Sequence, residues 1–294
     1  MKKNRILHLF QWRLKDIENN LEVISNQGFN MIQISPIQPL KEYTYVWWTL
    51  YQPCGFTIGN NWIGSKKDLI SLCNKAKKYN IKIIADVICN HTASNNSNKF
   101  LPHEKVDKIL INRSDFWKEK IEVHDWNNRY EVTHFNMGLP GLNTSNHDLQ
   151  DIIIKFLNEL IECGVRGFRF DAAKHIGLPE EGCDFFIRVL NNLNNKEELF
   201  NYAEVIFSDK FIIDNYAKYI KVLTDSYGSN KDTLVTFIES HDTYYEFKYT
   251  TKMTDEMMAH EYDILTNNFN NTLYFVRPFD DFWKSEIIKR INYK

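Results

Sequence analysis

Short apolar runs separated by longer amphipathic stretches dominate the pattern of this 294-residue chain, and four of the runs end in polar, titratable residues. The runs cover 81–85, 167–170, 199–203 and 234–238, and the residues that close them are Asp86, Asn90, His91, Asp171, Glu204, Glu239, His241 and Asp242. Runs rich in Val, Ile and Phe between helix-like stretches are typical of buried parallel strands joined by helices. The pattern predicts an α/β fold, with helices beginning near 149 and covering 211–220 and 281–291.

The run at 167–170 carries an arginine two residues before an aspartate. If it forms a strand, alternation places Arg169 and Asp171 on the same face. A guanidinium group this close would keep Asp171 ionised at neutral pH, which a carboxylate nucleophile requires. Taken alone, this spacing is more often a buried structural ion pair than a catalytic one.

The carboxyl ends of successive strands in a parallel barrel converge on one pocket. For each segment singly, a polar residue that merely closes a strand explains the pattern at least as well. Four such ends in one chain make coincidence a poor explanation. The pattern therefore predicts that the four ends share one site.

The residue types at these strand ends, and their order along the chain, resemble the four conserved regions of the α-amylase family, glycoside hydrolase family 13. The segment 7–17 resembles the first strand and helix of the animal-type branch, and 47–53 (WWTLYQP) resembles its aromatic platform. The resemblance covers about residues 5–277. It implies a (β/α)8 TIM barrel of residues 1–91 and 143–294, with a small inserted domain B at 92–142. A connection this long inside a compact domain is usually functional.

The spacing of the later runs predicts a departure from a complete barrel. Only 30 residues lie between Glu204 and Val235, where the family has a helix, a strand and another helix. One amphipathic helix over 211–220 would use most of them, so a reduced or missing sixth unit is expected. One helix is predicted after Arg277, so the family's C-terminal β-sandwich domain is expected to be absent.

The resemblance implies a retaining double displacement. Asp171 would be the nucleophile and Glu204 the acid and base, with their carboxyl groups about 5 to 5.5 Å apart. Asp242 would hold the sugar 2-OH and 3-OH. Glu204 would lie near it, in the drier part of the cleft. Asp86 would brace Arg169 rather than take part in the chemistry. A solvated glutamate at a strand end is the alternative for Glu204, and its apolar neighbours argue against it.

Substrate binding is the second implication. The residues that the resemblance places against the sugar are Tyr51, Trp47, Trp48, His91, Arg169, Lys174, His175 and His241. Tyr51 would stack beneath the sugar ring, and His91 and His241 would bind hydroxyl groups. Without the resemblance, the Trp pair is better explained by core packing, and Lys174 is as well explained as a solvated residue.

Ion sites are where the chain departs from the family. The family's structural calcium would use Asn90, the backbone carbonyl of His175 and an acidic residue at position 141, where this chain has Gly141. Loss of an anionic oxygen ligand predicts a weakened calcium site. Animal-type members also hold chloride with two arginines and an asparagine. Arg169 and Arg277 match the arginines, but Ser240 replaces the asparagine, so any chloride site would be compromised.

Composition narrows the class of partner. With 43% apolar residues, the chain is long enough for a barrel of about 250 residues plus an insertion. A net charge of −2 argues against nucleic acid as the main partner, and the longest apolar stretch is too short to span a bilayer. Five cysteines with no C-x-x-C pair favour reduced thiols. With no signal peptide visible, a cytoplasmic location is expected, although a mature secreted form would look the same.

The favoured hypothesis is an α-amylase-like hydrolase acting on internal α-1,4 bonds of starch, glycogen or maltooligosaccharides. Transglycosylation through the same intermediate stays open. The alternative is a catalytically impaired barrel that only binds α-glucans, which the short sixth unit would favour. Oligomeric state is not predicted. The apolar side chains of the last helix, Trp283 among them, either close the barrel, which is the preferred interpretation, or mediate self-association.

Overall fold

The computed structural model describes residues 3–42, 44, 46–224, 230–247 and 253–294. Parallel strands close into a barrel in chain order, and β8 pairs with β1. The strands are β1 (Asn4–Leu9), β2 (Met31–Ile34), β3 (Lys82–Val87), β4 (Phe168–Phe170), β5 (Tyr202–Glu204), β6 (Lys221–Thr224), β7 (Leu234–Phe237) and β8 (Asn271–Phe275). Each strand is almost wholly buried, because its outer face packs on helices and its inner face fills the barrel. The predicted TIM barrel is confirmed.

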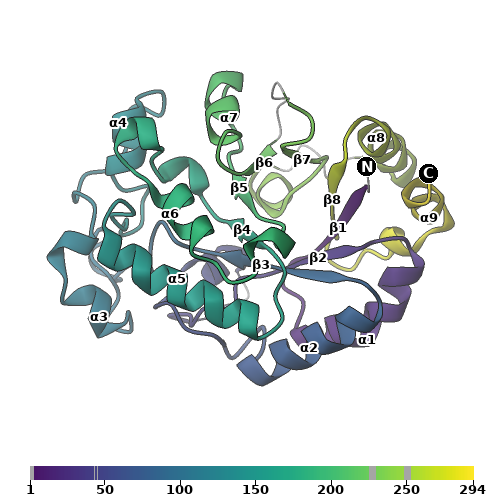
Figure 1. The fold of residues 1–294 in the computed structure, drawn as a ribbon, viewed down its shortest axis with the longest axis horizontal. Coiled ribbons are helices and arrows are strands. Elements are labelled where there is room, and N and C mark those ends of the chain that lie inside the picture. Colours follow the sequence, from purple (N-terminus) through teal and green to yellow (C-terminus); the bar gives the residue numbers. More distant parts are fainter. Residues whose placement is uncertain (1–2, 43, 45, 225–229, 248–252) are drawn as a thin grey trace.

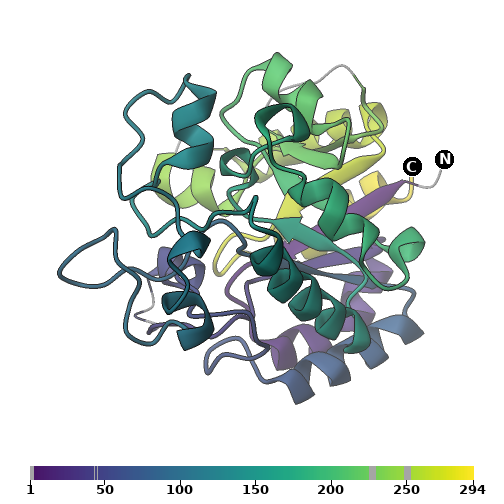
Figure 2. The ribbon, with the colours of Figure 1, turned by 60° about the vertical axis from the view of Figure 1, so that its left-hand side comes forward.

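Helices cover the outside of the barrel (Figure 1). They are α1 (Leu14–Asn26), α2 (Lys66–Lys78), α5 (His147–Glu162), α6 (Phe185–Asn191), α7 (Lys210–Tyr216), α8 (Asp255–Asn268) and α9 (Glu286–Asn292), whereas α3 (Lys108–Ile111) and α4 (Arg129–His134) lie to one side (Figure 2). The long helix α5 buries an apolar stripe, and Asn146 caps its first turn by accepting from the backbone N–H groups of Asp148 and Leu149.

The segment 92–142 connects β3 to the start of α5 and lies to one side of the barrel, at the left of Figure 2. It contains the short helices α3 and α4 and is otherwise irregular. An isolated bridge between His91 and Gly141 joins the end of the segment to the barrel rim, and a bridge between Trp117 and Leu142 lies within the segment. The insertion therefore stands beside the carboxyl ends of β3 and β4.

The sixth unit is reduced but not missing. Strand β6 is present and pairs with both β5 and β7, and nine residues, 225–233, separate it from β7. Helix α7 ends at Tyr216 rather than at 220, because 217–220 form the connection into β6. The barrel closes because the strand needs only four residues to pair with its neighbours.

The predicted helix over 281–291 is divided. A turn of 3-10 helix (Phe282–Lys284) precedes α9, which begins after Ser285, whose side chain accepts from the Ile288 backbone N–H. Trp283 is buried against Trp12, with ring centroids 6.4 Å apart. The apolar face thus packs on the barrel, as the preferred interpretation had it, and Trp283 is not a surface residue.

A close backbone approach fixes β4 beside β5. A Cβ atom at Gly167 would collide with the carbonyl group of Phe200. The absence of a side chain at Gly167 allows β4 and β5 to pair immediately before Asp171 and Glu204.

Candidate active site

Four carboxyl groups meet at the carboxyl ends of the barrel strands. Asp86 lies near the end of β3, Asp171 directly follows β4, Glu204 ends β5 and Asp242 follows β7. The register pairs Asp86 with Arg169 across β3 and β4. The convergence predicted from the strand ends is confirmed for these residues.

Arg169 is the centre of this carboxylate cluster and is fully buried. Its Nη1 donates to both oxygens of Asp86 at 2.8 Å and to Asp171 Oδ1 at 2.7 Å. Its Nη2 donates to Glu204. The contacts with Asp86 and Asp171 agree with the sequence analysis, whereas the pairing with Glu204 was not predicted.

One guanidinium group cannot balance all of these carboxylates. Burial raises the pKa of Asp171 well above its usual range, and it raises the pKa of Asp86 to about 6 and of Asp242 to about 8. Arg169 lowers each of these pKa values, and the charge of Glu204 raises each of them. The cluster therefore retains a proton near neutral pH. The prediction that Arg169 keeps Asp171 ionised left out the effect of burial.

The backbone immediately after β4 positions the carboxyl group of Glu204. Ala172 has a left-handed conformation, with φ at 47°, and its N–H donates to Glu204 Oε2 at 3.0 Å. Asp242 lines the same cavity as Glu204, and the charge of Glu204 raises the pKa of the Asp242 carboxyl group. Glu204 is thus buried and close to a second carboxyl group, as expected. A strained, non-glycine residue of this kind is typical of a functional site.

A cavity of about 440 Å³ opens above the carboxylate cluster. It is lined by Trp47, Trp48, Tyr51, Gln52, His91, Met137, Leu139, Asp171, Ala172, Lys174, His175, Glu204, Ile206, Phe207, His241, Asp242 and Glu246. Among the predicted site residues, Asn90, Arg169, Ser240 and Arg277 do not line it. Arg169 lies beneath the cavity, so its buried guanidinium acts through the carboxylates that it binds.

Aromatic rings form one wall of this cavity. Tyr51 lies parallel to His241, with ring centroids 5.0 Å apart and an angle of 6° between the planes. Trp47 stacks on Tyr245 at 5.9 Å. Trp48 is the most open of these rings, with 45% of its surface exposed. Tyr51 and Trp47 are therefore held by protein contacts on one side, whereas Trp48 offers a free apolar face to the cavity.

The histidines of the cavity wall are neutral and only partly hydrogen-bonded. Burial lowers the pKa of His91 to about 4 and lowers the pKa values of His175 and His241 well below their usual range. His91 Nδ1, His175 Nε2 and His241 Nδ1 are buried and, among the described residues, have no hydrogen-bond partner. Buried polar atoms without a partner are costly, so these nitrogens suit a ligand that carries hydroxyl groups.

Lys174 stands between two aromatic rings that the sequence analysis did not single out. Its Nζ lies 5.6 Å from the ring centroid of Trp126 and 5.9 Å from that of Phe207. Phe207 also adopts a positive φ of 54°. Half-exposed aromatic side chains outside any family motif carry no signal in a single sequence, which is why they were missed.

The predicted calcium ligands bind a lysine. Lys118 Nζ donates to Asn90 Oδ1 and to the backbone carbonyl of His175, both at 2.8 Å. Burial lowers the pKa of Lys118 to about 7. Within the described ranges, no group of three or more His, Cys, Asp or Glu side chains could hold a metal ion. A calcium ion would have to displace this amine from both oxygens, so the residues present do not fit the ion.

The predicted chloride residues also have protein partners. Arg277 Nε donates to Glu239 Oε2 at 2.7 Å, and the Ser240 backbone N–H donates to Thr243 Oγ1 at 2.8 Å. Arg169 is engaged with the carboxylate cluster. A chloride ion would therefore have to compete with the Glu239 carboxylate for Arg277.

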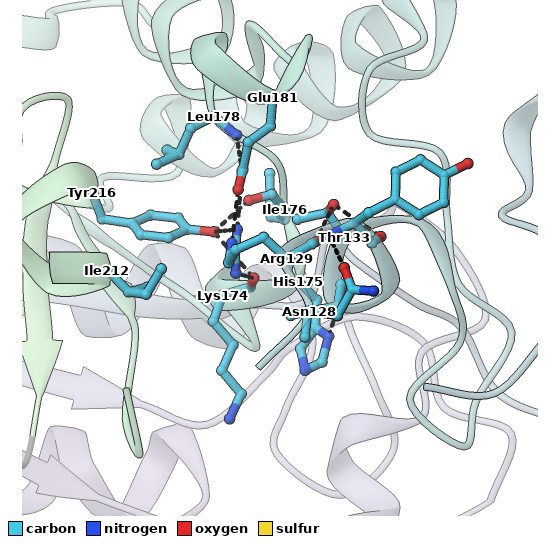
Figure 3. A network of polar contacts seen from close by, with 12 residues as sticks. Asn128, Arg129, Thr133, Lys174, His175, Ile176, Leu178, Glu181, Ile212 and Tyr216 are labelled. Atoms are coloured by element: carbon cyan, nitrogen blue, oxygen red, sulfur yellow. Dashed lines mark hydrogen bonds and ion pairs between the residues drawn. The ribbon is translucent and has the colours of Figure 1, made fainter. Parts of the chain in front are cut away.

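A second polar network holds the segment after β4 from the side of the insertion (Figure 3). Arg129 donates to both carboxylate oxygens of Glu181, at 2.7 and 2.9 Å, and to the carbonyl of Lys174 at 2.8 Å. The Tyr216 hydroxyl donates to the carbonyl of Ile176 at 2.6 Å. The side chain of Lys174 points away from this network (Figure 3).

Within the described part of the chain, every helix is too short or too polar to cross a lipid bilayer.

Comparison with known proteins identifies the family. The catalytic-domain model of α-amylase matches residues 13–284. An α-amylase of Clostridium acetobutylicum is 32% identical over 98% of this chain and 42% of its own length, so the chain spans less than half of that relative. The α-amylase of Geobacillus thermoleovorans, solved with acarbose, superposes with a TM-score of 0.76 at 17% identity, over 99% of this chain and 77% of that one. A mutant α-amylase I of Eisenia fetida in complex with maltohexaose gives a TM-score of 0.73 at 22% identity, over 94% and 68%. The extent of these matches shows that the chain belongs to the α-amylase family.

Proposed function

We propose that this chain is a retaining glycoside hydrolase that cleaves internal α-1,4-glucosidic bonds of starch, glycogen or maltooligosaccharides. The observation that carries the proposal is the position of Asp171, Glu204 and Asp242 on one cavity. Acarbose and maltohexaose in the two structural neighbours support an α-glucan as the ligand class.

Asp171 acts as the nucleophile. Arg169 donates directly to Asp171 Oδ1, which stabilises the carboxylate form against the effect of burial. The free oxygen attacks the anomeric carbon as the glycosidic bond breaks, and a covalent glycosyl-enzyme intermediate forms. Water then attacks the same carbon and releases the sugar with its original configuration.

Glu204 protonates the departing glycosidic oxygen and afterwards takes a proton from the attacking water. Because its pKa is raised to about 8, Asp242 retains a proton near neutral pH on the same cavity as Glu204. When substrate enters, this proton passes from Asp242 to Glu204, which delivers it to the leaving oxygen. Asp242 then binds the hydroxyl groups of the same sugar.

The cavity wall supplies binding and orientation. The unpartnered nitrogens of His91, His175 and His241 accept from or donate to sugar hydroxyl groups, because neutral imidazole can do either. Trp48 offers an apolar face to the C–H side of a sugar ring. Lys174, with Trp126 and Phe207, extends the binding surface beyond the cleavage point.

Two contacts of Glu204 favour the alternative of a barrel that only binds glucans. Arg169 and the Ala172 N–H each bind one oxygen of Glu204, so both oxygens of the proposed acid are already engaged. For catalysis, substrate binding must shift these contacts so that the proton held near Asp242 can reach the glycosidic oxygen.

Incubation with maltoheptaose tests the proposal. The favoured function predicts new reducing ends, short products of several lengths, and an α-anomer seen first by proton NMR. Binding of maltoheptaose without new reducing ends would establish the alternative. Products longer than the substrate would indicate transglycosylation through the same intermediate.

A further inference from the structure

Lys118 is a buried lysine that has no carboxylate among its hydrogen-bond partners in the described part of the chain. It belongs to the insertion, and its Nζ bridges Asn90, just after β3, and the carbonyl of His175, in the 3-10 turn after β4. Its backbone N–H donates to the Gly141 carbonyl at 2.9 Å. One side chain thus joins the insertion to two strand ends of the barrel.

The segment that Lys118 holds is part of the site. His175 lines the cavity, and its Nδ1 is in hydrogen-bond contact with the Val132 carbonyl at 2.9 Å. Arg129 binds the carbonyl of the preceding residue, Lys174 (Figure 3). Cationic or amine groups of the insertion therefore bind two consecutive carbonyls of the segment that follows Asp171.

Gly141 explains how the lysine fits. A Cβ atom at position 141 would lie 2.8 Å from Lys118 Cδ and 2.7 Å from Asn136 Oδ1. Such distances are too short for non-bonded atoms, so the Lys118 stem and a side chain at position 141 exclude each other. An acidic residue at 141 and a lysine at 118 are alternative ways of filling one space.

We propose that the Lys118 amine takes the structural place of a calcium ion in this chain. It binds the two oxygens that would ligate calcium, and so it connects the insertion to the segment around His175. A calcium ion gathers oxygen ligands from separate segments into one rigid unit. A lysine donates up to three hydrogen bonds and can gather the same oxygens without the acidic ligands that a metal needs. The inference does not depend on the proposed function, because its readouts are melting and hydrogen exchange.

The test compares the wild-type chain with Lys118→Met and with the control Lys120→Met, an exposed lysine of the same segment. The melting temperatures of the wild-type chain in EDTA and in calcium should differ by less than about 2 °C. A structural ion that binds only the folded state would make them differ by more. Lys118→Met should melt at least about 5 °C lower than Lys120→Met, because it leaves buried acceptors unpaired. Amide exchange in 172–178 should rise about tenfold or more in Lys118→Met and stay unchanged in β3.

A double variant makes the exchange of amine for metal explicit. Lys118→Ala with Gly141→Asp removes the stem that a Cβ at position 141 would meet and adds a carboxyl group there, and the Asn136 side chain, 2.7 Å from that Cβ, has to turn aside. Calcium should raise its melting temperature by about 3 °C or more, and EDTA should reverse the gain. If Lys118→Met yields no folded protein, a rise in the melting temperature of the double variant in calcium still supports the proposal.

Two results would overturn the inference. The first is a wild-type melting temperature that falls by more than about 5 °C in EDTA and recovers with calcium, since an ion would then do this work. The second is that Lys118→Met has the same melting temperature as Lys120→Met and shows unchanged amide hydrogen exchange at 172–178. A double variant that remains unfolded in calcium while Lys118→Met is also unfolded counts against it as well.

Discussion

The Tyr51 hydroxyl donates to Asp86 Oδ2 at 2.9 Å, so the aromatic wall of the cavity is tied to the carboxylate cluster beneath it. Asp86 in turn binds Arg169, which binds Asp171. The ring of Tyr51 meanwhile lies on His241. The position of the cavity wall and the charge state of Asp171, the proposed nucleophile, are thus linked through consecutive hydrogen bonds.

Replacing Tyr51 with Phe keeps the ring and removes this bond. The buried Asp86 oxygen loses a donor, which costs about 1–3 kcal/mol, or a few degrees of melting temperature. The matched control is Tyr219→Phe, whose hydroxyl donates to Glu180 at 2.8 Å on the exposed surface. Calorimetry should show a drop for Tyr51→Phe and almost none for Tyr219→Phe. Equal effects would mean that burial adds nothing to the Tyr51 bond.

The raised pKa of Asp242 predicts a stability that depends on pH. The folded pKa is about 8, against about 3.9 when unfolded, so the folded state binds the extra proton between these values. Stability from this group is present below pH about 4 and is lost as pH rises towards about 8. Asp242→Asn removes the loss, so its melting temperature should exceed that of wild type by more at pH 8 than at pH 5.

Asp16→Asn, which alters an exposed carboxyl group on α1, is the control for that experiment. Its difference from wild type should be the same at both pH values. If Asp242→Asn also gives a constant difference, the carboxyl group does not carry the retained proton. Loss of hydrolysis in Asp242→Asn together with greater stability at pH 8 would show that the site trades stability for function.

Trp48→Ala should weaken substrate binding without affecting the fold. The ring lines the cavity with nearly half of its surface exposed, so few core contacts are lost. Loss of one sugar-stacking face should raise KM for maltoheptaose about tenfold, with kcat within about twofold. Phe279→Ala, at an exposed ring that does not line the cavity, should leave both constants unchanged. A fall in kcat alone for Trp48→Ala would assign the ring to the chemical step.

Local periodicity predicted the features that depend on neighbours in sequence. Arg169 and Asp171 share a face because a strand alternates, and the glutamate of 199–204 ends a strand because the apolar run stops there. The pattern of parallel strands also predicted that the strand ends share one site, and the family resemblance then supplied the eight-stranded barrel. The pairing of Glu204 with Arg169 was not predicted, because it depends on the register between β4 and β5.

Lys118 shows where prediction from the sequence stops. Its partners lie 28 and 57 residues away, in segments with no periodic pattern that would align them. The missing acidic residue at position 141 was visible, and it indicated a weakened calcium site. That a lysine fills the same space could be found only from coordinates, because the residue sits among scattered charges of the insertion.

Turnover of maltoheptaose by Asp171→Asn, measured beside its binding affinity, tests the central claim most directly. The variant preserves shape and removes the nucleophile, so kcat should fall by about 10³-fold or more while affinity stays within a few-fold of wild type. Asp232→Asn, at an exposed residue before β7, should retain full activity. Activity of Asp171→Asn within about tenfold of wild type would contradict the assignment of Asp171 as the nucleophile.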